Sequence, residues 1–158
     1  MPQSAVDTAP VTAKKAPDAV RPGLLSYNVK VLLALEKSIE GKDTFFQWLV
    51  ENGYPELGAF SNFLHDDPNA EQFLVKTGNG WLGLLSHAID GDKRALAWVK
   101  MHLHQANLMF AFACREEEKA QSWLRFMKLD ILLQLAEAVA FVRNHQELDR
   151  AFPYKYKF

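Results

Sequence analysis

The chain repeats itself about every 25 residues, and this period limits its possible folds more than any other feature. Large apolar residues recur at that step in five successive units, at Leu35, Phe60, Leu85, Phe110 and Leu135. A second apolar column accompanies the first, at Ile39, Leu64, Ile89, Cys114 and Val139. A unit of this length holds two short helices and a turn, and it cannot bury its apolar face alone. We therefore expect a stack of degenerate two-helix repeats.

Three further columns support the repeat. Trp or Phe occupies four of five positions in an aromatic column, at Trp48, Phe73, Trp98, Trp123 and Leu148. An apolar column follows it directly, at Leu49, Leu74, Val99 and Leu124. Small residues, which allow helices to approach closely, recur at Ala70, Ala95 and Ala120, where the first unit has Phe45. We expect the Leu35 and Trp48 columns to be buried between neighbouring units.

Polar breaks divide each unit into two helices. The breaks are Gly41–Asp43, Asp66–Pro68, Gly91–Lys93 and Glu116–Glu118. Glycine ends a helix because it adopts positive φ without strain, and Asp accepts hydrogen bonds from the free N–H groups of the next helix. Asp67 before Pro68 is the clearest signal, since proline at the first helical position loses no hydrogen bond.

The second half of the chain allows two architectures. No Gly or Pro interrupts Arg94–Cys114 or Lys119–Arg150, so a plain reading predicts two long helices and a compact bundle. The repeat period predicts turns near His104–Asn107 and Lys128–Leu132 instead. The expected fold class is thus all-α: two-helix repeats stacked as a short α-solenoid or as a compact helical bundle.

The ends of the chain differ from its middle. Residues 1–22 are rich in Ala, Pro, Val and Thr and contain no large aromatic residue, which predicts a disordered N-terminal arm. Residues 23–152 form the expected repeat domain, and residues 153–158 form an aromatic and basic tail. In that tail Tyr154, Tyr156 and Phe158 alternate with lysines. Two interpretations remain: a cap over the last repeat, or a strand donated to a partner's sheet.

Parts of the chain resemble a known repeat family. Leu35–Asp43 and Leu85–Asp92 look like the first helix and turn of ankyrin repeats, and Trp48–Gly53 is similar to the end of an ankyrin second helix. The resemblance covers Leu32 to about Phe126. The Thr-Pro-Leu-His signature is absent, and the period is shorter than the roughly 33 residues of ankyrin. The resemblance implies partner binding and no chemistry.

The sequence shows no recognisable catalytic or metal-binding pattern. His102 and His104 are two residues apart on a predicted helix and point to different sides, whereas helical metal sites use a four-residue spacing. The lone Cys114 stands among apolar residues, which predicts a buried, unreactive thiol. Gly78-Asn79-Gly80 lacks the Lys-Ser/Thr of a phosphate-binding loop. We expect no enzyme activity, no metal and no cofactor.

The remaining class is a protein-interaction module of the adaptor or scaffold type. The helix positions predicted to face away from the core give a ladder of candidate contacts: Lys37, Glu40, Asn62, His65, His87, Asp90, Phe112 and Arg115. An exposed Phe112 is expected to anchor the partner. The alternatives are a small-molecule binder or enzyme with a pocket between helices, and a structural subunit of a larger assembly.

Charge and hydropathy narrow the partner and the location. The formal net charge of −1 argues against a nucleic-acid surface. No apolar run approaches the roughly 18 residues of a membrane span. Met1–Arg21 lacks the charged-then-apolar layout of a secretory signal. The expected partner is another protein, and the expected location is the cytoplasm.

Overall fold

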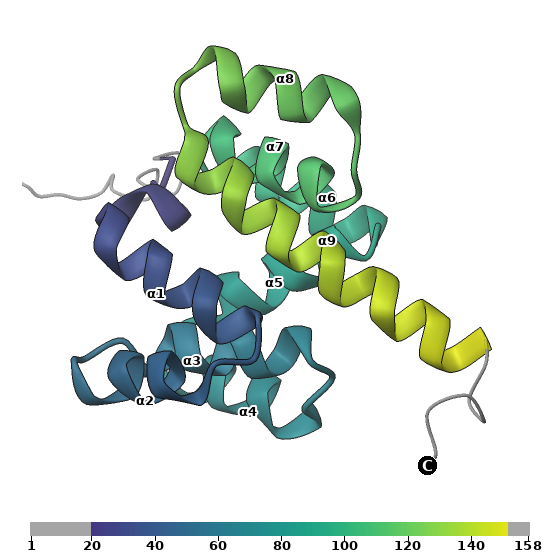
Figure 1. Ribbon diagram of the computed structural model, residues 1–158. Helices are drawn as coiled ribbons and strands as arrows, with labels where there is room; N and C mark the ends of the chain where they lie inside the picture. Colours follow the sequence, from purple (N-terminus) through teal and green to yellow (C-terminus); the bar gives the residue numbers. More distant parts are fainter. Residues whose placement is uncertain (1–19, 152–158) are drawn as a thin grey trace, which may run out of the picture.

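The computed structural model describes residues 20–151, and over this range the regular structure is helical (Figure 1). The elements are a 3₁₀ segment η2 (Gly23–Ser26), then α1 (Val29–Ile39), α2 (Asp43–Glu51), α3 (Pro55–Leu64), α4 (Pro68–Lys76), α5 (Gly80–Ile89), α6 (Lys93–His102), α7 (Gln105–Cys114), α8 (Glu118–Phe126) and α9 (Asp130–Ala151). The all-α prediction is confirmed for the described residues. Tyr154, Tyr156 and Phe158 lie outside them, as do residues 1–19 of the N-terminal arm.

The helices follow the predicted 25-residue period. Helices α3, α5, α7 and α9 start at residues 55, 80, 105 and 130, a step of 25. We call α1, α3, α5, α7 and α9 the inner helices, and α2, α4, α6 and α8 the outer helices. The turns predicted near His104–Asn107 and Lys128–Leu132 are both present. The rival prediction of one helix through residues 94–114 is wrong, because Leu103 takes an extended conformation.

Helix α9 departs from the period at its far end. A fifth turn would fall near residues 141–143, but α9 continues to Ala151. The four observed turns place a residue of positive φ at matching positions: Gly41 (96°), Asp66 (67°), Gly91 (88°) and Glu116 (64°). The matching residue in the fifth unit is Phe141, a bulky residue for which positive φ is strained. The helix therefore runs on.

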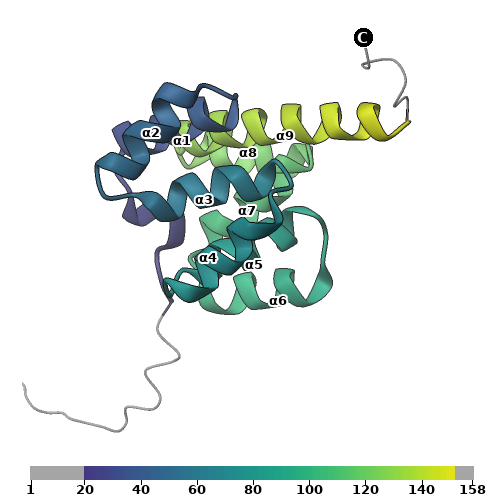
Figure 2. The same ribbon diagram turned by 90° about the horizontal axis from the view of Figure 1, so that it is seen from below.

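The stack of helical hairpins closes on itself. Each inner helix packs against the inner helices before and after it, and α9 packs against both α7 and α1. Figure 1 shows α1 alongside α9, and Figure 2 shows the same two helices together at the top of the turned view. The five inner helices of the described chain thus form a closed ring. Each outer helix packs against its own inner helix and against the inner helix that follows.

The core follows three of the predicted columns. The Leu35 column is fully buried, the Ile39 column is at most 8% exposed, and the Leu49 column is fully buried through Leu124. The expectation that the aromatic column also forms core is wrong. Trp48, Trp98 and Trp123 are half-buried, whereas Phe73 and Leu148 are exposed. Trp48, Phe73, Trp98 and Trp123 lie on the outer helices, where one side of a helix remains in solvent, and Leu148 lies on the extension of α9.

The N-terminal segment Val20–Ser26, called the strap below, crosses to α6 and α7. The Arg21 N–H donates to the His102 carbonyl (3.0 Å), and the His104 N–H donates to the Arg21 carbonyl (2.8 Å). Asn107 is completely buried; its Oδ1 accepts from the Leu24 N–H and its Nδ2 donates to the Pro22 carbonyl, both at 2.9 Å. Residues 20–22, which the sequence analysis places in the arm, are thus held by hydrogen bonds. No helix within residues 20–151 is long and apolar enough to cross a membrane.

Candidate helix-binding groove

The ladder predicted from the sequence lies at the C-terminal ends of the inner helices. Glu40, His65, Asp90 and Arg115 are exposed, and Lys37, Asn62, His87 and Phe112 are half-buried. Phe112 packs against the core, so the expectation of an exposed anchor is wrong. The phenyl ring turns inward because an inner helix is covered on several sides by its neighbours. Whether the other residues bind a partner remains a prediction.

Several ladder residues satisfy the last carbonyls of neighbouring helices, which have no partner within their own helix. His65 Nε2 lies 2.8 Å from the Ile39 carbonyl, and Arg115 Nη1 donates to the Ile89 carbonyl at 3.1 Å. Arg115 stands 50 residues, or two repeats, after His65, and Ile89 stands 50 residues after Ile39. These hydrogen bonds therefore join the C-terminal end of α3 to that of α1, and the C-terminal end of α7 to that of α5.

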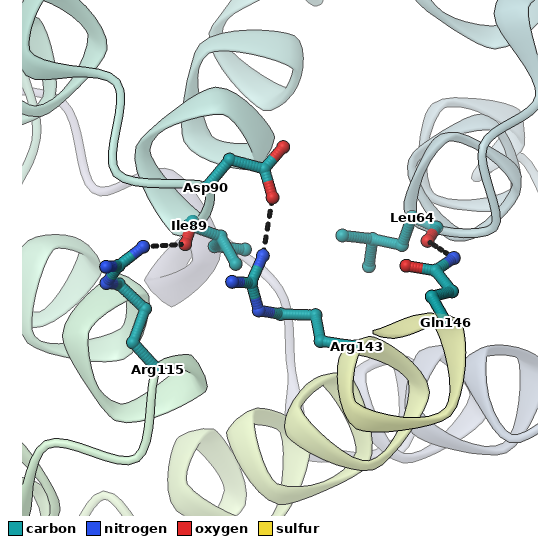
Figure 3. Close-up of polar contacts among 6 residues, drawn as sticks. All are labelled: Leu64, Ile89, Asp90, Arg115, Arg143 and Gln146. Atoms are coloured by element: carbon teal, nitrogen blue, oxygen red, sulfur yellow. Dashed lines mark hydrogen bonds and ion pairs between the residues drawn. The ribbon is translucent and has the colours of Figure 1, made fainter. Parts of the chain in front are cut away.

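The extension of α9 crosses the same end of the ring (Figure 3). Arg143 forms an ion pair with Asp90, and Gln146 Nε2 donates to the Leu64 carbonyl at 2.9 Å. Leu64 occupies the repeat position of Ile39 and Ile89, whose carbonyls are taken by His65 and Arg115. Much of the predicted ladder is thus occupied by contacts within the chain.

A groove of about 730 Å³ lies between α1 and α2. Its lining is mostly apolar and consists of Val29, Lys30, Leu33, Ala34, Lys37, Thr44, Phe45, Gln47, Trp48 and Glu51. Val29, Leu33 and Phe45 are 57%, 40% and 38% exposed. Exposed apolar side chains gathered in one concave place mark candidate binding sites. Of the ladder, only Lys37 belongs to this groove.

The repeat explains why the groove is open. At the repeat position of Leu33 stand Gly58 and Gly83 in α3 and α5, and a Cβ at Gly58 would lie 3.1 Å from Phe46 of α2. In α9 the same position is Leu133, which is only 9% exposed, and α8 packs on that helix. Each later inner helix therefore receives the preceding outer helix. No described outer helix precedes α1, so Leu33 is uncovered.

Phe45 marks the groove in a second way. The residue at its position in the later outer helices is a buried alanine, at Ala70, Ala95 and Ala120, each at most 5% exposed. The first unit alone places an aromatic side chain there and exposes it. An exposed phenylalanine at a position where the later units bury an alanine is typical of a binding surface.

Trp48, one of the lining residues, takes part in a series of aromatic contacts. Trp48 stacks on Tyr54 with ring centroids 6.3 Å apart, and Tyr54 meets Tyr27 edge-on at 5.9 Å. The Tyr27 hydroxyl donates to Glu56 Oε2 at 2.8 Å. Burial, together with this hydrogen bond, raises the pKa of Tyr27 far above its ordinary value, so the phenol stays protonated. Lys30 lies 5.6 Å from the Trp48 ring, within the range of a cation–π contact.

The described residues offer little reactive chemistry. No group of three or more His, Cys, Asp or Glu side chains between residues 20 and 151 is placed to hold a metal ion. Cys114 is buried, and desolvation raises the pKa of its thiol well above the ordinary value, which keeps it in the unreactive thiol form.

Glu36, beside the α1–α9 contact, is the acid most perturbed by its surroundings. Its Oε1 atom is buried without a hydrogen-bond partner among the described residues. Burial, followed by the charge of Glu40, raises the pKa of the Glu36 carboxyl above 4.5. A carboxyl with a raised folded-state pKa stabilises the fold below its unfolded-state pKa, and this stabilisation is lost as the pH rises through the folded-state value.

We therefore expect Glu36→Gln to stabilise the protein at pH 7. Removing the Glu36–Glu40 repulsion should increase the free energy of unfolding by about 0.2–0.5 kcal/mol. The gain should vanish below about pH 3, where the Glu36 carboxyl is protonated in both the folded and the unfolded state. Urea unfolding at the two pH values measures this difference, and an equal gain at both would contradict the assignment.

Comparisons with known proteins give no relative for this chain. No protein-family model matches it, no curated protein matches it, and no solved structure matches it. The resemblance to ankyrin repeats therefore stays a prediction.

Lys37 is the one residue of the groove that was predicted from the sequence as a partner contact. Two signals pointed to the groove: Phe45 interrupts a column of alanines, and Leu33 stands where the next two units have glycine.

Proposed function

We propose that the protein is a non-catalytic interaction module of the adaptor or scaffold type, and that the groove between α1 and α2 receives a helix from a partner protein. One observation carries this proposal. Leu33 and Leu133 are the same residue at the same repeat position, yet Leu133 is 9% exposed and Leu33 is 40% exposed. An outer helix packs on each later inner helix, where Leu133 is buried and Leu108 is half-buried, so a helix is the shape that fits the uncovered copy.

The chemistry of the groove agrees with helix recognition. Helix-in-groove binding depends on apolar anchors that enter an apolar channel, with polar residues along its edges. Here Val29, Leu33 and Phe45 offer apolar surface, and Lys30 and Lys37 stand among the polar lining residues. The cytoplasmic location expected from the sequence stays part of the proposal, because a single thiol cannot form an internal disulfide.

Partner capture with a groove variant tests the function. We expect the full-length chain, used as bait in its native cells, to retain a stoichiometric protein that Leu33→Asp loses, because docking would have to bury a carboxylate in an apolar groove. Affinity for the purified partner should fall at least about 30-fold, which corresponds to roughly 2 kcal/mol. Phe126→Ala is the matched control, since Phe126 is 82% exposed on α8 and lies outside the groove.

The second candidate is a small-molecule binder, because about 730 Å³ lies within the usual 300–1,000 Å³ range of ligand pockets. A thermal-shift screen separates the two. A metabolite that raises the melting temperature of the wild-type chain but not of Leu33→Asp would overturn the helix proposal.

A further inference from the structure

We infer that the partner helix lies antiparallel to α1 and places a carboxylate in its first turn, opposite Lys37. This inference rests on the proposed function and specifies the chemistry of the partner. It follows from the way the chain fills the same groove in its third unit, where α4 packs against α5.

Helix α4 shows the geometry that the partner is expected to copy. Glu71, in the first turn of α4, places Oε2 2.8 Å from Nε2 of His87 on α5. A Cβ at Gly83 would lie 3.8 Å from Glu71 Cγ. Gly83 and His87 occupy the repeat positions of Leu33 and Lys37, each 50 residues further along the chain. A helix that packs on α1 in the same direction and register, displaced outward by the Leu33 side chain, therefore sets its Glu71-like residue beside Leu33 and Lys37.

The charges around Lys37 favour an acid at that place. Glu71 is in the first turn of α4 and meets His87 in the last turn of α5, so the two helices run in opposite directions. An antiparallel partner helix therefore brings its N-terminus, with its positive partial charge, toward Lys37. A carboxylate between the N-terminus of the partner helix and the Lys37 ammonium group interacts favourably with both and stabilises the complex. The only ion pair of Lys37 within the described residues is with Glu40, at 3.4 Å and partly in solvent.

Helix α2 supplies the apolar half of the pattern. A Cβ at Gly58 would lie 3.4 Å from Val50 Cγ2 and 3.1 Å from Phe46 Cε1. Phe46 occupies the repeat position of Glu71, and Val50 follows it by four residues, which is one helical turn. The expected partner helix thus carries an acid in its first turn and an apolar residue four positions later.

The ends of this chain do not match that pattern. Residues 152–158 contain two lysines and no acid, so their charge opposes Lys30 and Lys37. In residues 1–19 Pro10 separates Asp7 from Val11, and a proline at that place interrupts a helix. The other acid there, Asp18, has Pro22 and no apolar helix former four positions later. The occupant that fits is an acidic amphipathic helix of another protein.

A charge-swap experiment with a synthetic helix tests the inference. The probe is a fluorescent peptide with the sequence of residues 67–76, the segment that contains Glu71. Because a helix this short is marginal alone, a lactam joins Lys76 to position 72 after Gln72→Glu; both positions face solvent in α4. Fluorescence anisotropy with the full-length chain should show saturable binding with a dissociation constant below about 1 mM. The Glu71→Lys peptide should bind about 2–5-fold more weakly, and Lys37→Glu in the chain should restore its binding.

The controls separate this inference from the proposed function. Lys100→Glu makes the same charge change on α6, outside the groove, and should restore nothing. Equal binding of both peptides, or no binding by a peptide whose circular dichroism is helical, would overturn the inference. The proposed function would still stand if Leu33→Asp lost the native partner. A dimer in sedimentation equilibrium that Leu33→Asp dissociates would overturn the choice of another protein as the occupant.

Discussion

Replacing Phe110 with alanine should lower the free energy of unfolding by about 3–5 kcal/mol, because it removes a large, fully buried side chain and leaves a cavity. Phe110 lies on α7, which packs against α5, α8 and α9, so few neighbours can move in to fill the space. The loss is a large part of the roughly 5–15 kcal/mol by which a typical domain is stable. Urea denaturation of the full-length chain measures it.

Two further variants keep this expectation falsifiable. Phe110→Leu fills most of the space and should remain folded if Phe110→Ala does not, with a loss of about 1–1.5 kcal/mol. Trp98→Ala should lose only about 1–2 kcal/mol, because Trp98 is half-buried and packs near His102 and Arg21 at the edge of α6. A greater loss at Trp98 than at Phe110 would contradict the placement of the core in the Leu35 column.

Replacing Gly23 with alanine should detach the strap from α7. Gly23 has a φ of 63°, and a Cβ there would lie 2.4 Å from Asn107 Oδ1, the atom that accepts from the Leu24 N–H. The substitution therefore combines left-handed backbone strain with the loss of buried hydrogen bonds. We expect a loss of about 2–4 kcal/mol in the free energy of unfolding. Hydrogen exchange should show faster exchange at the Leu24 and His104 amides.

Gly53→Ala is the matched control for backbone strain alone. Gly53 has a φ of 93°, and a Cβ there would meet nothing within 4 Å. Its substitution should cost only the strain, about 1–2 kcal/mol. Equal losses at Gly23 and Gly53 would show that the collision with Asn107 contributes nothing.

The sequence predicted the helical units and their period because both depend on local spacing. Leu35 and Leu49 mark columns that are buried wherever the structure describes a two-helix unit, and the Asp67–Pro68 pair caps its helix as expected. The aromatic column failed because a periodic Trp indicates a helix face without indicating how much of that face is covered. Trp48 and Trp98 have the same period as the core but lie on outer helices.

The closure of the ring and the groove could not be predicted in the same way. Closure depends on the rotation between successive units, which no residue pattern reports. The groove is open because no described outer helix precedes α1. Its residues can therefore be recognised only by comparing them with the residues at the same repeat positions of the later units. Leu33 becomes informative once Leu133 is seen to be buried on α9, a helix against which α8 packs.

The contact between α1 and α9 has a consequence for how the protein folds and unfolds. An open row of repeats can fray from either end, because its terminal units have a single neighbour each. Here the first and last inner helices are neighbours, so among the described units none is terminal in that sense. Residues about 100 positions apart must meet before the ring is complete, and contacts of such long sequence separation slow folding. We expect the protein to unfold in one cooperative step and, during synthesis, to complete its core only after α9 has left the ribosome.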